Sequence, residues 1–156
     1  MSLFEREFRD CLGRFATGVA LITVMDEGSA RAMTINSFAS VSLDPPLILW
    51  SLAKDSHRYD RFLNAQNFAV NILAADQADL SAACARNDDL HANGGQWTLA
   101  DNGAPLLKDA IARFECRRHA VMPGGDHEII LGEVLNVDRP RDAEALVFVR
   151  SGYKQI

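Results

Sequence analysis

A run of short polar side chains lies between two apolar segments, from Thr34 to Ser42, and contains one threonine, one asparagine and three serines. Hydroxyl and amide groups of this size offer hydrogen-bond donors and acceptors and leave the backbone open to a ligand. The pattern therefore suits a flat heterocycle with polar atoms on its edge. On residue types alone, a turn in which Ser and Asn bond their own backbone is the simpler interpretation.

Strong local signatures of other chemistry are absent from the sequence. It contains no Gly-rich dinucleotide fingerprint, no phosphate-loop lysine, no serine-hydrolase elbow and no histidine pair at metal-ligand spacing. The three cysteines, Cys11, Cys84 and Cys116, are far apart and odd in number. We therefore expect reduced thiols, with neither a disulfide framework nor a metal site.

Length and composition favour one domain over residues 1–156, because 48% of the residues are hydrophobic. A chain of this length buries roughly two thirds of its unfolded surface. The net charge of -5 argues against nucleic-acid binding, which needs clustered Lys and Arg. No apolar run approaches the about 18 residues of a membrane span, and nothing near Met1 resembles a signal peptide. We expect a cytoplasmic protein without nucleic-acid or membrane partners.

Apolar periodicity predicts the elements that must position the polar run. Helices are expected near the N-terminus, around Tyr59 to Leu63, and after Asp76 as N-cap. An ordered loop around Trp97 is expected between Asn87 and Gly103. The predicted strands are Val19–Met25, Arg31–Asn36, Leu47–Leu52, Phe68–Leu73, Phe114–Val121, His127–Val137 and Leu146–Val149.

Strands joined by short turns outnumber helices, and no regular strand-helix alternation appears, which disfavours a parallel doubly wound sheet. We predict a mainly β fold, a small antiparallel barrel with helices at its rim.

Several sequence blocks resemble, in order, those of one known family. They are 8–19, Met33-Thr34-Ile35-Asn36-Ser37-Phe38, 40–47, Phe68-Ala69-Val70-Asn71-Ile72-Leu73, Phe114-Glu115-Cys116, Gly125-Asp126-His127 and Gly132-Glu133-Val134. Their joint occurrence over most of the chain resembles the flavin reductase-like family, the small reductase components of two-component flavin-dependent monooxygenases. The resemblance implies a split β-barrel with antiparallel Greek-key topology.

The resemblance also implies roles for individual residues. The wall that lines the isoalloxazine and ribityl chain would consist of Thr34, Asn36, Ser37, Ser40, Val41 and Ser42. The phosphate would lie after the next strand, against Ala53, Lys54 and Ser56. Only Ser56 matches the family's usual Asn-x-x-Ser-x-Thr pattern cleanly. Lys54 and Arg58 are expected either to contact phosphate or to form a solvated surface pair.

Two further residues are implied to face the nicotinamide. His127, in the Gly-Asp-His turn, resembles the family residue beside the nicotinamide and is predicted to be catalytic, although a lone His at a strand start is more often structural. Tyr153 matches a C-terminal aromatic near the cofactor, with a core or interface role as the alternative. Trp50 is assigned to packing, and the other three histidines to surface or structural roles.

The implied activity is hydride transfer from NADH or NADPH to FMN or FAD. The resemblance further implies a homodimer that supplies reduced flavin to a flavin-dependent monooxygenase. Two alternatives stay open from the sequence: a flavin-binding sensor or carrier without reductase activity, and a structural or interaction protein whose polar run is only a turn.

Overall fold

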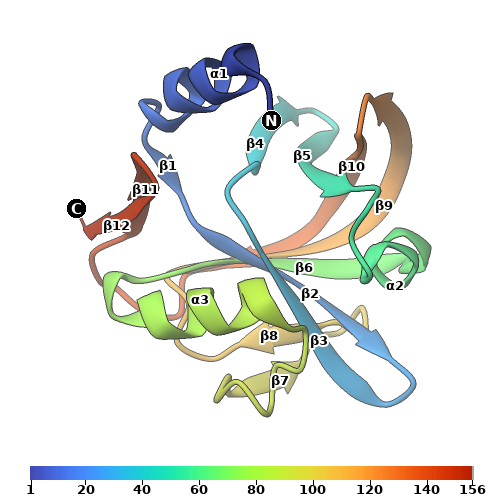
Figure 1. Ribbon diagram of the computed structural model, residues 1–156. Coiled ribbons are helices and arrows are strands. Elements are labelled where there is room, and N and C mark those ends of the chain that lie inside the picture. The colour runs from blue at the N-terminus through green and yellow to red at the C-terminus, as the bar shows by residue number, and fades with distance from the viewer. Residues whose placement is uncertain (156) are drawn as a thin grey trace.

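Seven antiparallel strands form the main sheet, in the order β3-β2-β6-β9-β10-β5-β4 (Figure 1). The computed structural model describes residues 1–155. The strands of this sheet are β2 (Ala20–Asp26), β3 (Ser29–Ile35), β4 (Ala39–Leu43), β5 (Pro46–Ala53), β6 (Asn67–Ile72), β9 (Ala112–Gly124) and β10 (His127–Asp138). The two end strands, β3 and β4, follow each other in the chain but do not pair, so the sheet stays open between them.

Two smaller sheets complete the β structure. One has the order β1-β11-β12 and brings together β1 (Thr17–Gly18), β11 (Leu146–Val149) and β12 (Gly152–Gln155). The other is the hairpin of β7 (Trp97–Leu99) and β8 (Pro105–Leu107). The mainly β, antiparallel class predicted from the sequence is confirmed.

The described residues contain three α-helices and one 3-10 turn. They are α1 (Leu3–Gly13), α2 (Tyr59–Asn64), the 3-10 turn η1 (Ala75–Gln77) and α3 (Ala78–Arg86). A capping box starts α1: the Ser2 hydroxyl accepts from the Glu5 amide at 3.1 Å, and the Glu5 carboxylate accepts from the Ser2 amide at 2.6 Å. No residue of α1 is buried, so the apolar face of this helix is uncovered in the monomer.

Trp50 organises the main core, since only 1% of it is exposed and it packs edge-on against Phe62 and Phe68. Its assignment to packing is therefore confirmed. Gly132 of β10 is required by the same packing, because a Cβ there would lie 2.7 Å from the Phe68 ring and 3.2 Å from Ile48. The glycine lets β10 approach the core closely.

Asn71 is a buried connector between three strands. Its amide nitrogen donates to the Leu21 carbonyl and the Thr23 hydroxyl, and its amide oxygen accepts from the Leu107 backbone at 2.9 Å. Each polar atom of this fully buried side chain is thus bonded within the protein. Asn71 holds β2, β6 and β8 together and has no free group for a ligand.

The structure differs from the sequence-based element prediction at several places. The N-cap of α3 is Gln77 and not Asp76. The Asp76 carboxylate instead pairs with Arg141, which is 65 residues away in the sequence. The loop predicted around Trp97 contains the β7–β8 hairpin. The polar run continues into the edge strand β4 rather than forming only a turn. Within residues 1–155, no helix is long and apolar enough to cross a membrane.

Candidate functional site

The polar run, which starts at the end of β3, borders two adjoining clefts that share Val19 and Asn36 in their linings. One, of about 190 Å³, is also lined by Thr34, Ser81, Phe148 and Tyr153. The other, of about 240 Å³, lies toward Phe15, Thr17 and Phe38. Each is smaller than the roughly 300–1,000 Å³ of pockets that enclose a whole ligand. Each cleft thus has room for part of a ligand, with Asn36 between the two.

The Thr34 hydroxyl has a defined direction. It donates its proton to the Ser81 carbonyl at 2.6 Å, and a carbonyl oxygen can only accept. The lone pairs of the Thr34 oxygen therefore remain for the cleft. Thr34 can accept a hydrogen bond from a ligand N–H, such as the imide N–H of an isoalloxazine ring.

Ser37 and β4 offer the opposite polarity. The Ser37 oxygen accepts from the Ser51 amide at 3.0 Å, which leaves its own proton free to donate. In β4 the pairing with β5 shifts between Ser40 and Ser42, and Val41 is the extra residue of this bulge. Because the bulged residue lies outside the ladder, its backbone groups are available to a ligand.

The segment after β5 is bonded so that one hydroxyl remains a donor. The Ser56 oxygen accepts from the Arg58 amide at 3.1 Å, so its proton is free for an anionic oxygen. Lys54 is 43% exposed at its side chain, and its ammonium lies 3.9 Å from the Glu128 carboxylate. This long, solvated pair leaves most of the lysine charge available. Ala53 contributes backbone only, opposite His127 in the β5–β10 pairing.

Arg58 has neither of the two roles suggested by the sequence. It is 8% exposed, and its guanidinium donates to the Cys84 carbonyl at 2.7 Å and the Ala85 carbonyl at 2.8 Å. These carbonyls belong to the last turn of α3, where helix carbonyls lack intrahelical partners. Burial lowers the pKa of Arg58, and the nearby Asp88 carboxylate opposes that effect. Arg58 is therefore a buried helix-end cap.

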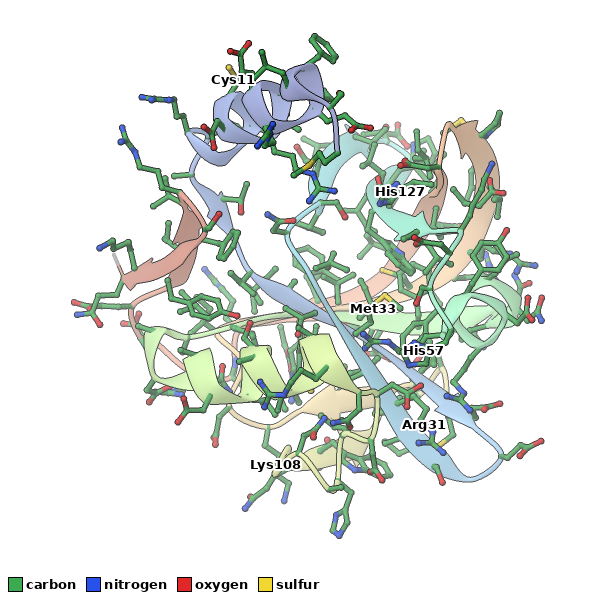
Figure 2. All side chains as sticks on the ribbon, in the orientation of Figure 1. Cys11, Arg31, Met33, His57, Lys108 and His127 are labelled. Atoms are coloured by element: carbon green, nitrogen blue, oxygen red, sulfur yellow. The ribbon has the colours of Figure 1, made fainter. Side chains whose placement is uncertain are left out.

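His127 begins β10, beside the end of β5 (Figure 2). Its Nδ1 lies 2.7 Å from the Asp126 carboxylate, and the hydrogen bond with His127 lowers the pKa of Asp126. The Lys54 amide donates to the Asp126 carbonyl at 3.0 Å. These bonds join the Gly-Asp-His turn to the segment after β5, so the predicted phosphate and nicotinamide residues meet at one end of the β5–β10 pair.

Tyr153 lies apart from His127. It is carried by β12, which lies on the opposite side of the view from β5 and β10 in Figure 1, and it lines the Thr34 cleft. The structure thus divides the predicted residues into a Thr34–Asn36–Tyr153 group and an Ala53–Lys54–Ser56–His127 group. Ser37 and β4 lie along the chain between them.

Ser81 is a site residue that the sequence did not single out. It is fully buried on α3, and its hydroxyl lies 2.9 Å from the Tyr153 phenol oxygen. The available signal was a hydroxyl three residues before Cys84, on the inner face of the helix. Its partner, 72 residues away, could not be identified from that pattern.

The polar groups are chemically compatible with a flavin. Thr34 could accept from a ring N–H, Ser37 and the β4 bulge could donate to ring carbonyls, and Ser56 with Lys54 could offer a donor and a cation to a phosphate. No group of three or more metal-ligating side chains occurs in the described part of the chain.

Comparison with known proteins gives consistent similarities. Residues 12–156 match the family described as "Flavin reductase like domain". The chain is 49% identical over 148 residues to the "FMN reductase (NADH) SmoA" of Agrobacterium fabrum, covering 92% of this chain and 82% of that protein. It is 44% identical over 132 residues to the reductase component of a flavin-dependent trigonelline monooxygenase of Acinetobacter baylyi. That match covers 84% of this chain but 43% of the relative.

A solved structure is similar throughout. The Streptomyces globisporus NADH:FAD oxidoreductase SgcE6, in complex with NAD and FAD fragments, superposes with a TM-score of 0.90 at 36% identity. The match covers 97% of this chain and 92% of that one. Fold, site and similarities together define a flavin-dependent oxidoreductase built on an open antiparallel sheet. The chain belongs to the flavin reductase-like family, and the flavin reductase predicted from its sequence is confirmed.

Proposed function

We propose that this protein transfers hydride from NADH to FMN or FAD at the site formed by the polar run, the segment after β5 and the Gly-Asp-His turn. The observation that supports the proposal is the complementary polarity of these groups: Thr34 is left able to accept, Ser37 and Ser56 are left able to donate, and the Lys54 charge is largely exposed for a phosphate. The bound flavin supplies the hydride acceptor. The protein then needs only to hold the two rings together and exclude water.

His127 is proposed to orient the nicotinamide. With Nδ1 bonded to Asp126, its Nε2 remains for the carboxamide of the nicotinamide. The paired Asp126 also fixes the ring plane. Tyr153 is proposed to border the cofactor from the other cleft, because it faces Thr34 and Asn36 there.

A homodimer is supported by the exposed apolar face of α1. Phe4 and Phe8 of this helix are 74% and 53% exposed, Phe15 just after it is 77% exposed, and Leu43 at the end of β4 is 96% exposed. In Figure 1, α1 and β4 lie at the same end of the molecule. Monomeric proteins rarely leave such an apolar patch uncovered. We propose that a second copy covers it, beside the flavin wall of β4.

The oxygenase partner and the cellular location are also proposals. Similarity to a monooxygenase reductase component supports release of reduced flavin to a flavin-dependent monooxygenase. The cysteines of the described chain are free thiols, which agrees with the cytoplasmic location expected from the sequence.

Turnover with each pairing of NADH or NADPH with FMN or FAD tests the activity. Oxidation of NADH, followed at its absorbance band, is the expected result. Absence of turnover with all four pairings would exclude a reductase, and tight flavin retention without turnover would point to a carrier.

His127→Ala tests the nicotinamide site. The variant should raise KM for NADH by about tenfold, the effect of one lost polar contact, with little change in KM for flavin. His91→Ala, at an exposed loop position, is the matched control. Equal kinetics for the two variants would remove His127 from the site.

Phe8→Glu tests the dimer. A charge on the apolar face of α1 that the second copy is proposed to cover should convert the dimer, as measured by light scattering, into a monomer. Leu99→Glu, at an exposed apolar position on β7, should leave the dimer intact. A monomeric wild-type protein would refute the proposed assembly.

A further inference from the structure

Ser81 contacts both walls of the Thr34 cleft. Its carbonyl accepts the Thr34 hydroxyl proton at 2.6 Å, and its own hydroxyl bonds the Tyr153 phenol at 2.9 Å. Thr34 belongs to β3 and Tyr153 to β12, which are in different sheets. One buried residue of α3 therefore bonds two side chains, carried by different sheets, that face the same space.

Tyr153 has contacts to its own sheet and to α3. Strand β12 is an edge strand that pairs with β11 alone. The Tyr153 ring packs edge-on against Phe148, with 5.6 Å between ring centroids, and is 38% exposed. The ring contact restricts the tyrosine but does not join it to α3. The Ser81 hydroxyl provides that connection.

We propose that Ser81 is a positioning residue of the flavin site, which holds Tyr153 as the wall opposite Thr34. The inference rests on the proposed function, because it assigns the ligand of this cleft as the imide-bearing edge of a planar heterocycle. The Thr34 oxygen presents only lone pairs and selects an N–H donor at that edge. The Tyr153 ring then limits the width of the space beside it. Neither action requires Ser81 to touch the flavin, so its effect acts through Thr34 and Tyr153.

The test is a double-mutant cycle of Ser81→Ala, Tyr153→Phe and the combined variant. FMN binding is measured by the quenching of flavin fluorescence, together with KM for flavin, KM for NADH and kcat. Each single variant should weaken FMN binding by about three- to tenfold, the effect of one hydrogen bond. KM for flavin should rise in parallel, while kcat at saturating flavin changes little.

The double variant should be no weaker than the stronger single variant, because both substitutions remove the same bond. If the losses of FMN affinity in the two single variants multiply in the double variant, Ser81 and Tyr153 act independently and the proposal is overturned. Unchanged FMN binding in Tyr153→Phe would also overturn it. That variant lacks only the phenol oxygen, so it tests the same bond if Ser81→Ala does not fold.

Cys84→Ala is the matched control for general damage to α3. Its side chain is buried one turn from Ser81 but does not line the cleft. This variant should lower the melting temperature and leave FMN affinity unchanged. If it weakens FMN binding as much as Ser81→Ala does, Ser81 has only a structural role.

The wild-type protein separates this inference from the function on which it rests. If the wild-type protein reduces flavin and Ser81→Ala binds FMN as tightly as the wild type, only the positioning role is refuted. A wild-type protein that binds neither FMN nor FAD would refute both.

Discussion

Replacement of Arg58 by alanine should destabilise the fold without a specific effect on phosphate binding. Arg58 lies two residues after Ser56, close in sequence to the proposed phosphate contacts, yet its guanidinium is buried against the end of α3. The substitution leaves the carbonyls of Cys84 and Ala85 without their donor. It also opens a polar void between α3 and the segment after β5.

The magnitude follows from the two short bonds, at 2.7 and 2.8 Å. A hydrogen bond to a charged group contributes about 1.5–3 kcal/mol. Water can reach part of the opened space, because Ala85 is exposed, so we expect a loss of about 3 kcal/mol rather than the full sum. For a chain of this size, that loss lowers Tm by roughly 6–12 °C.

The assay compares Arg58→Ala with Lys54→Ala in two measurements. Thermal unfolding followed by circular dichroism gives Tm, and titration well below Tm gives the affinities for FMN and for riboflavin. Riboflavin lacks the phosphate, so the ratio of the two affinities isolates the phosphate contact. Lys54→Ala should keep Tm within about 2 °C but weaken FMN about tenfold relative to riboflavin.

Arg58→Lys adds a conservative control. A lysine keeps the charge but cannot place two donors on two carbonyls as the planar guanidinium does, so most of the stability loss should persist. Our reasoning fails if Arg58→Ala keeps the wild-type Tm and selectively weakens FMN. That result would make Arg58 a phosphate ligand.

Three further outcomes follow from the packing and the charges. Gly132→Ala should cost about 1–3 kcal/mol in chemical denaturation, because its Cβ would meet the Phe68 ring at 2.7 Å; a neutral result would mean that the core yields there. Burial raises the pKa of Cys116 to about 12, so a thiol reagent at pH 8 should spare Cys116 until the protein unfolds. The hydrogen bond from Arg113 lowers the pKa of Asp138 below its ordinary 3.8. The Arg113–Asp138 pair therefore stabilises the fold fully above pH 3.8, and this stabilisation is lost as the pH falls through the lower pKa of the folded state. Asp138→Asn lacks this ionisable group, so it should lose less stability than the wild type when the solution is acidified.

The sequence predicted the strands well, because alternation of apolar and polar side chains is a local property. The strands expected around Val19–Met25 and His127–Val137 occur as β2 and β10 with small shifts at their ends. The edge strands β1 and β12 were missed, since each is short and defined by pairing with β11 rather than by its own pattern. The apolar residues of α1 likewise follow a helical pattern, but this pattern does not indicate which surface packs against them.

Within the site, residue types determined what each group can do, and tertiary structure decided what it does. A threonine hydroxyl can donate or accept, and only the Ser81 carbonyl, 47 residues away, makes Thr34 an acceptor toward the cleft. From the sequence, Arg58 could contact phosphate, because it lies beside the predicted phosphate segment. In the structure, its guanidinium caps the end of α3 instead. The sequence alone thus determined the family, the strand pattern and the polar run from Thr34 to Ser42. The direction of each hydrogen bond came from distant partners, because only the folded chain brings together groups that are far apart along it.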